Sequence, residues 1–193
     1  GHTHPHYVKR IKDQLDQIAF YSNSVQIPIQ NEYAEKLGEL SGYPDYGLFL
    51  CNSGAEANEN AIKLASFATG KSGFLAFSGS YHGRTSGAVA LTDNPKIVAP
   101  CNAREDFHIL PWEDLGAVEE ALKSNEIAGI IIEGIQGVNG IQVPSADFLL
   151  GLASLAKMYG AKLILDEVQS GFGRTGKFFA HQHVSDLKPA IIS

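Results

Sequence analysis

The sequence LILDEVQSGFGRTG, residues 163–176, gives the strongest indication of the fold. An apolar run from Leu163 to Leu165 ends in two acids, Asp166 and Glu167, and continues into a glycine-rich loop. Such a continuous run, bounded by turn residues, predicts a strand that is covered on both faces, as in a parallel sheet.

Asp166, at the tip of this strand, is the first candidate functional residue. A carboxylate in that position is only partly solvated and needs a partner. A protonated ring nitrogen would serve and would be kept protonated in return. A metal ion and an ion pair with Arg174 are the alternatives, although magnesium is disfavoured because the chain has no Walker A sequence.

Apolar runs and helical patterns alternate along the rest of the chain. Strands are predicted at residues 47–51, 73–77, 88–91, 107–110, 127–133 and 162–165, and helices at 55–68, 114–123 and 146–159. A further strand begins in the apolar run 189–193. This alternation predicts an α/β fold: a mostly parallel sheet with helices on both faces. In such sheets the ligand lies at the carboxyl ends of the strands.

The composition argues against several classes of protein. Of the 193 residues, 44% are hydrophobic and 19% are charged, which is typical of a globular domain. A net charge of −6 with no basic stripe argues against nucleic-acid binding. We find no apolar run long enough for a bilayer and no signal segment, and the two cysteines, Cys51 and Cys101, make a disulfide framework improbable. We therefore expect a cytoplasmic protein without membrane contact.

A second motif, NSGAEANE at residues 52–59, opens the predicted helix 55–68. The free N–H groups of a first helical turn and the helix dipole favour an anion there, and Gly54 permits close approach of the backbone, so this turn could cradle a phosphate. An ordinary helix start with Ser53 as N-cap is the alternative.

A third motif, SYHGRT at residues 80–85, follows the predicted strand 73–77. The Tyr81 ring could lie flat on a heteroaromatic ring, and Arg84 could bind a carboxylate through two hydrogen bonds. A surface loop with a solvated arginine is the alternative.

Together these three motifs resemble those of the class III, fold-type-I aminotransferases, which use pyridoxal phosphate (PLP). The resemblance covers the whole chain and places residues 1–193 in the family's large PLP-binding domain. The first and third motifs are most similar to the branch that acts on acetylornithine. Early segments also match, at Gly1-His2-Thr3-His4-Pro5 and Ser22-Asn23.

The resemblance assigns a set of residues to PLP. The phosphate is matched to Ser53, Gly54 and Ala55, and the two ring faces are matched to Tyr81 and Val168. The ring nitrogen is matched to Asp166 and the phenolic oxygen to Gln169, and an acid near the ring is matched to Glu133. Arg84 matches the arginine that holds the α-carboxylate of acylornithine. Asp166 is the one catalytic residue of the family that this chain contains.

The implied reaction is transamination between N-acylornithine, acetylated or succinylated, and 2-oxoglutarate, in arginine biosynthesis. The resemblance also implies a homodimer. A sister class III aminotransferase acting on ornithine, 4-aminobutyrate or diaminopelargonate is the alternative. His82 favours acylornithine over ornithine as substrate. A non-catalytic PLP-binding module without the lysine is a second alternative. We expect no metal site, including at His2, His4 and His6.

The chain departs from the family pattern in several places. The Schiff-base lysine is not among residues 1–193, and we expect it shortly after Ser193 in a longer chain. The family's N-terminal segment and small C-terminal domain are expected outside this chain too. After the glutamate matched to Glu133, relatives carry a second glutamate at the position of Val138, and its loss leaves the identity of the substrate undetermined. Ala190 stands where an aspartate is usual.

Overall fold

The computed structural model describes residues 2–18, 25–124 and 126–193. The chain forms two compact units, Gly1–Leu48 and Phe49–Ser193. Each is described by itself. Of the early segments matched to the family, Gly1 and Ser22-Asn23 lie outside the described residues.

Two helices make up the described part of the first unit: α1, Pro5–Leu15, and α2, Pro28–Ser41. Neither helix was predicted from the sequence. Both begin with proline, which suits the first helical position because its missing N–H is not needed there. Helix α2 ends at Gly42, whose φ of 77° places it in the left-handed region that glycine adopts without strain.

The second unit is an α/β structure. Its helices are α3, Gly54–Thr69; α4, Ser86–Ala90; α5, Leu115–Leu122; and α6, Ala146–Tyr159; its short 3-10 helices are η1, Pro95–Ile97; η2, Pro100–Asn102; and η3, Ala180–His183. Its strands are β1, Gly73–Phe77; β2, Phe107–Leu110; β3, Ile127–Glu133; β4, Lys162–Asp166; and β5, Ile191–Ile192. All strand pairs are parallel, in the order β2-β1-β3-β4-β5. The predicted α/β fold class is confirmed.

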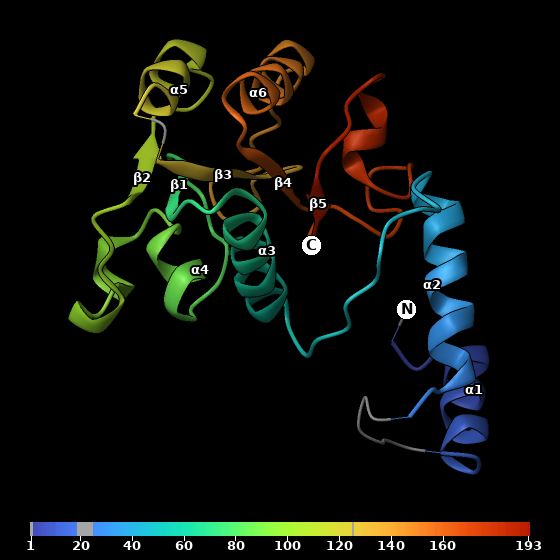
Figure 1. Ribbon diagram of the computed structural model, residues 1–193. Coiled ribbons are helices and arrows are strands. Elements are labelled where there is room, and N and C mark those ends of the chain that lie inside the picture. Colours follow the sequence, from blue (N-terminus) through green and yellow to red (C-terminus); the bar gives the residue numbers. More distant parts are fainter. Residues whose placement is uncertain (1, 19–24, 125) are drawn as a thin grey trace. The chain divides into compact units, whose positions relative to one another are not determined.

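Helices cover both faces of the sheet, with α5 and α6 on one side and α3 and α4 on the other (Figure 1). Alternate strand residues therefore enter different cores. Leu75 and Phe77 pack with α5 and α6, whereas Phe74 and Ala76 pack with α3. Because every residue of β1 and β3 is buried, these strands read as continuous apolar runs in the sequence.

Two of the strand predictions were wrong. Residues 88–91 belong largely to helix α4, because the alanine-rich sequence from Ser86 to Ala90 favours a helix and a short apolar run cannot distinguish the two states. Residues 47–51 pair with no strand in the described part of the chain, and Phe49 is 60% exposed. Their apolar character was mistaken for strand formation, which also needs a neighbouring strand to accept the backbone hydrogen bonds.

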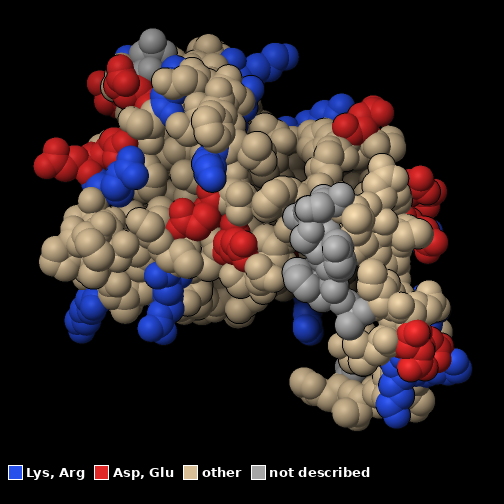
Figure 2. All heavy atoms as spheres, turned by 60° about the horizontal axis from the view of Figure 1, so that its bottom comes forward, with Lys and Arg blue, Asp and Glu red and all other residues tan. Residues whose placement is uncertain are grey.

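The parallel sheet brings two acids together at the carboxyl ends of its strands. Glu133 ends β3, Asp166 ends β4, and the two are paired in the strand register. On the face shown in Figure 2, acidic and basic side chains lie interspersed. Among the described residues, no helix has the length and apolar character needed to cross a membrane.

Candidate functional site

Asp166 is the centre of a buried hydrogen-bond network at the carboxyl end of β4. Only 5% of its surface is exposed. Its Oδ2 accepts hydrogen bonds from Asn58 Nδ2 at 2.7 Å and from His82 Nδ1 at 2.8 Å, and its Oδ1 accepts one from the Val168 N–H at 3.1 Å. Among the described residues Asp166 therefore pairs with His82, and it forms no ion pair with Arg174, the partner that the sequence left open.

His82 is buried with its second ring nitrogen unpaired. Nδ1 must carry a proton to donate to the carboxylate, and the His82 N–H donates to Thr92 Oγ1. Nε2 has no hydrogen-bond partner among the described residues. A proton on Nε2 would therefore be a buried and unpaired N–H, which is unfavourable.

Glu133 lies beside Asp166 with a different electrostatic setting. Burial raises the pKa of its carboxyl above the ordinary value, and the Tyr81 N–H, which donates to Oε1 at 2.9 Å, offsets only part of that effect. This hydrogen bond holds the backbone of the third motif against the end of β3. Two carboxyl groups thus lie at the carboxyl ends of neighbouring strands, and burial raises the pKa of the Glu133 carboxyl.

The N-terminus of α3 forms the other part of the site. Ser53 is its N-cap, and Ser53 Oγ accepts a hydrogen bond from the Glu56 N–H, as the capping interpretation predicted. The N–H groups of Gly54 and Ala55 donate to no acceptor within the described ranges, so the cap leaves them free. Glu56 also accepts from Asn52 N–H and Nδ2, which lowers the pKa of Glu56.

Close packing joins this helix start to the other two motifs. A Cβ atom on Gly54 would lie 2.7 Å from Val168 Cγ1, and one on Gly83 would lie 2.6 Å from the Ala55 Cβ. The three motifs are therefore in van der Waals contact, although more than 100 residues separate the first from the second.

We expect Gly54→Ala to destabilise the protein by about 1–3 kcal/mol, because the new methyl group overlaps Val168. Adding Val168→Ala should recover most of that loss, since Val168 is half-exposed and its truncation opens the space. Urea unfolding of the two single variants and the double variant measures this coupling. Gly116→Ala in α5 is the matched control, because its Cβ would meet only Asp114 Oδ1, at 3.2 Å. Additive effects of the two substitutions would contradict the contact.

The remaining predicted residues lie in the third motif and on the loop after β4. The Tyr81 side chain is 38% exposed, and Val168 and Gln169 are exposed on the loop after β4. Gln169 lies against Gly137, where an added Cβ would overlap its Oε1. Arg84 is exposed, and its side chain forms no ion pair or hydrogen bond with any residue that the structure describes. Val138 is 67% exposed on the neighbouring loop.

Sequence reasoning missed three polar residues. Asn58 and His82 lie within the quoted motifs, but their bonds to Asp166 span 108 and 84 residues, which no local pattern reveals. Glu167 was quoted beside Asp166 without a role. It is buried and accepts hydrogen bonds from Ser170 Oγ and His181 Nδ1. Across the described ranges, no cluster of three or more His, Cys, Asp or Glu residues could hold a metal ion.

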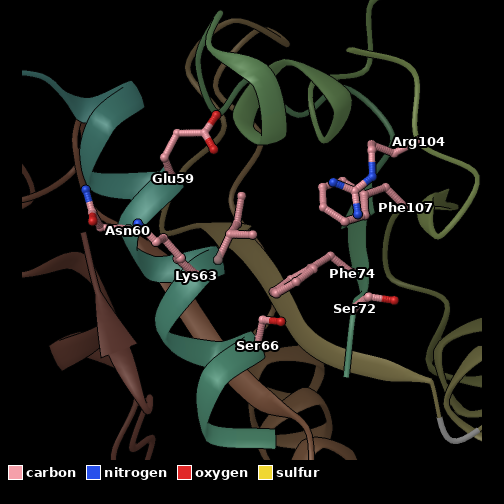
Figure 3. A pocket seen from close by; sticks show the side chains of 9 residues that line it. Glu59, Asn60, Lys63, Ser66, Ser72, Phe74, Arg104 and Phe107 are labelled. Atoms are coloured by element: carbon pink, nitrogen blue, oxygen red, sulfur yellow. The ribbon is translucent and has the colours of Figure 1, made fainter. Parts of the chain in front are cut away.

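A surface hollow of about 390 Å³ lies elsewhere, between α3 and strands β1 and β2 (Figure 3). Phe74 and Phe107 form part of its wall, and Arg104 lies over the Phe107 ring at 4.7 Å from its centroid. Phe74 and Phe107 lie toward the amino ends of their strands. The hollow is thus distinct from the edge that carries Asp166 and Glu133.

Comparison with known proteins relates this geometry to a family. The chain is 41% identical over 193 residues to an acetylornithine aminotransferase of Methanopyrus kandleri, covering 100% of this chain and 49% of that protein. It is 42% identical over 194 residues to the acetylornithine aminotransferase of Bacillus subtilis, covering 100% of this chain and 50% of that protein. The chain thus spans about half the length of these relatives.

A solved structure shares the fold. It is taurine:2-oxoglutarate aminotransferase from Bifidobacterium kashiwanohense in complex with PLP and glutamate, with a TM-score of 0.91 and 30% identity over 100% of this chain and 48% of that one. The family model "Aminotransferase class-III" matches residues 1–193. With these motifs, this sheet and these relatives, the chain belongs to the class III aminotransferases.

Proposed function

We propose that this chain is the cofactor-binding part of a PLP-dependent aminotransferase. The observation that carries the proposal is the buried Asp166 carboxylate, which is surrounded by hydrogen-bond donors at the same sheet edge as the free N-terminus of α3. A charge so placed needs a cationic ligand to complement it. A ligand with a phosphate at one end and a protonated ring nitrogen at the other would complement both parts.

The described residues fit PLP. The N–H groups of Gly54 and Ala55 are free for phosphate oxygens, and Ser53 adds a hydroxyl. Tyr81 and Val168 present apolar surface for the two ring faces, and Gln169 presents an amide for the phenolic oxygen. When bound, PLP supplies an electron-withdrawing ring that stabilises negative charge on the carbon next to the substrate nitrogen.

The chain's own residues then have distinct tasks. Asp166 would hold a proton on the ring nitrogen, and so maintain the ring's electron-withdrawing character. Glu133, near the ring, would fix the backbone of the third motif through the Tyr81 N–H. Arg84, exposed and without an ion partner among the described residues, would bind the substrate α-carboxylate.

The proposed substrates are N-acylornithine, acetylated or succinylated, and 2-oxoglutarate, in arginine biosynthesis. Relatives named acetylornithine aminotransferase at 41% and 42% identity support this choice over ornithine. A Toxoplasma gondii ornithine aminotransferase is 28% identical, with a TM-score of 0.89, and keeps the sister reaction as the alternative.

We further propose a cytoplasmic homodimer. Leu64 and Phe67 on α3 are 53% and 79% exposed, an apolar surface that a second copy would cover. The two cysteines are free, which suits a reducing compartment.

Transamination by the intact protein tests the proposal. We expect PLP binding, and turnover with 2-oxoglutarate that is at least about tenfold more efficient (kcat/KM) with N-acetylornithine or N-succinylornithine than with ornithine or 4-aminobutyrate. Borohydride reduction of the PLP-loaded protein, followed by peptide mapping, should label one lysine. PLP binding without labelling or turnover would favour a non-catalytic PLP-binding module. Absence of PLP binding would refute both the aminotransferase and the PLP-binding module.

A further inference from the structure

Asn58 connects four parts of the proposed site through one side chain. Its Nδ2 donates to Asp166 Oδ2 and to the His82 carbonyl oxygen, each at 2.7 Å. Its Oδ1 accepts a hydrogen bond from Ser193 Oγ at 2.6 Å. The side chain is buried, with 1% of the residue exposed. Helix α3, the third motif, the end of β4 and the residue after β5 thus meet at one amide.

The chemistry of these partners fixes the orientation of that amide. On one side lie two acceptors, a carboxylate oxygen and a backbone carbonyl, which require an NH2 group. On the other side lies a hydroxyl, which can donate to the amide oxygen. Reversing the amide would place its oxygen against two other oxygens. An aspartate at this position would do the same with a full charge.

The position of Asn58 in α3 gives this network a geometric consequence. Asn58 follows Gly54 by four residues, or about 6 Å along the helix axis. The phosphate end of the proposed site lies at the start of α3, and the Asp166 carboxylate is held one turn further along the same helix. One rigid helix therefore spans the interval between the two groups that would hold the two ends of the cofactor.

We propose that Asn58 is the positioning residue that fixes Asp166 relative to the N-terminus of α3. This inference rests on the proposed function, because it assigns Asn58 a part in PLP binding. Asn58 acts through Asp166 and does not itself touch the cofactor. Its removal should therefore weaken PLP binding only while Asp166 is present.

A double-mutant cycle on the intact protein tests this dependence. The dissociation constant of PLP is measured by absorbance titration for the wild type, Asn58→Ala, Asp166→Ala and the double variant. We expect Asn58→Ala to weaken PLP binding about 10- to 100-fold, the effect of losing a hydrogen bond to a charged group. The double variant should match Asp166→Ala within about twofold. Equal losses from Asn58→Ala in both backgrounds would make Asn58 a structural residue only and overturn the proposal.

The acid side of the PLP-binding pH profile is a second readout. Because Asn58 would act through the Asp166 carboxylate, its loss should change the acid limb of PLP binding, whereas the loss of a purely structural residue should not. His82 and Glu133 also face Asp166 and are unaltered in this variant. Asn60→Ala is the matched control, since Asn60 lies on the same helix and, among the described residues, its side chain donates only to the Glu56 carbonyl, so its profile should match the wild type.

Further controls separate the possible failures. Asn58→Ser retains a polar group but is too short to reach Asp166, and it replaces Asn58→Ala if thermal unfolding finds the alanine variant unfolded. If the wild type binds PLP and the Asn58 variants bind it equally well with unchanged acid limbs, this inference fails and the proposed function stands. If the wild type does not bind PLP, the proposed function fails and this inference fails with it.

Discussion

Replacing Asp166 with asparagine should lower kcat/KM for transamination by about 100- to 1000-fold, the size of effect seen when a preorganised electrostatic partner is removed from an active site. The neutral amide cannot balance a positive charge on the cofactor ring nitrogen. Without the carboxylate, the chain would no longer hold a proton on that nitrogen, which supports the stabilisation of negative charge that PLP supplies when bound. Steady-state kinetics with N-acetylornithine and 2-oxoglutarate measure the loss.

The hydrogen bonds around Asp166 make this substitution informative. Both carboxylate oxygens accept from donors, Oδ2 from Asn58 and His82 and Oδ1 from the Val168 N–H. An amide offers one oxygen, so its NH2 group must face a donor on one side. We expect the folded variant to be less stable by about 1–3 kcal/mol in addition to its kinetic defect.

Two measurements separate the electrostatic effect from the stability effect. The kinetic loss should persist at temperatures where circular dichroism finds the variant folded and where PLP is saturating. Asp147→Asn, an identical change in the exposed first turn of α6, should leave kcat/KM within about twofold of the wild type. Wild-type turnover by a folded Asp166→Asn variant would remove Asp166 from the mechanism.

The sequence predicted the elements whose signals are local. Helix α6 was predicted with its observed bounds, because Leu149, Leu152 and Ala156 recur at helical spacing and Gly160 is a helix-ending residue. In the structure Gly160 ends the helix with a φ of 70°. Strand β4 was predicted from its continuous apolar run and extends one residue further, to Asp166. In these segments the residues that specify the structure lie within the segment itself.

Prediction failed where the structure depends on distant partners. Residues 47–51 have the composition of a strand, but a strand forms only beside another strand, and sequence composition does not supply that neighbour. Asp166 could be predicted at a sheet edge, since strand ends in a parallel sheet share that edge. Its donors Asn58 and His82 could not, because their positions depend on how α3 and the third motif pack.

Glu167 gives the largest stability effect that we expect. Its side chain is fully buried and accepts four hydrogen bonds: Oε1 from the His181 N–H and Nδ1, each at 2.9 Å, and Oε2 from Ser170 Oγ at 2.5 Å and from the Ala180 N–H at 3.0 Å. These bonds hold the loop after β4 to helix η3. Glu167→Gln leaves two of the four donors facing an NH2 group. We expect a loss of about 3–5 kcal/mol, because two buried donors lose an acceptor that carries a charge.

Urea unfolding of the intact protein measures this loss, and we expect the midpoint to fall by about 2 M. Glu120→Gln on the exposed surface of α5 is the matched control, with a midpoint within about 0.3 M of the wild type. A Glu167→Gln midpoint equal to that of the control would mean that the network does not stabilise the folded state.

The pH dependence of unfolding provides an independent check on Glu167. Burial alone would raise the pKa of this carboxyl, but hydrogen bonds from His181, Ser170 and the backbone outweigh burial and lower the pKa below its ordinary value of 4.5. A lowered pKa in the folded state means that the folded protein binds this proton less readily than the unfolded chain does. The stabilisation is therefore complete above the ordinary value and is lost as the pH falls from there through the lowered folded value.

In Glu167→Gln this part of the acid-induced loss should disappear, so the stability curves of the variant and the wild type should converge below pH 4.5. Parallel curves throughout the acid range would contradict an ionised Glu167 in the folded protein.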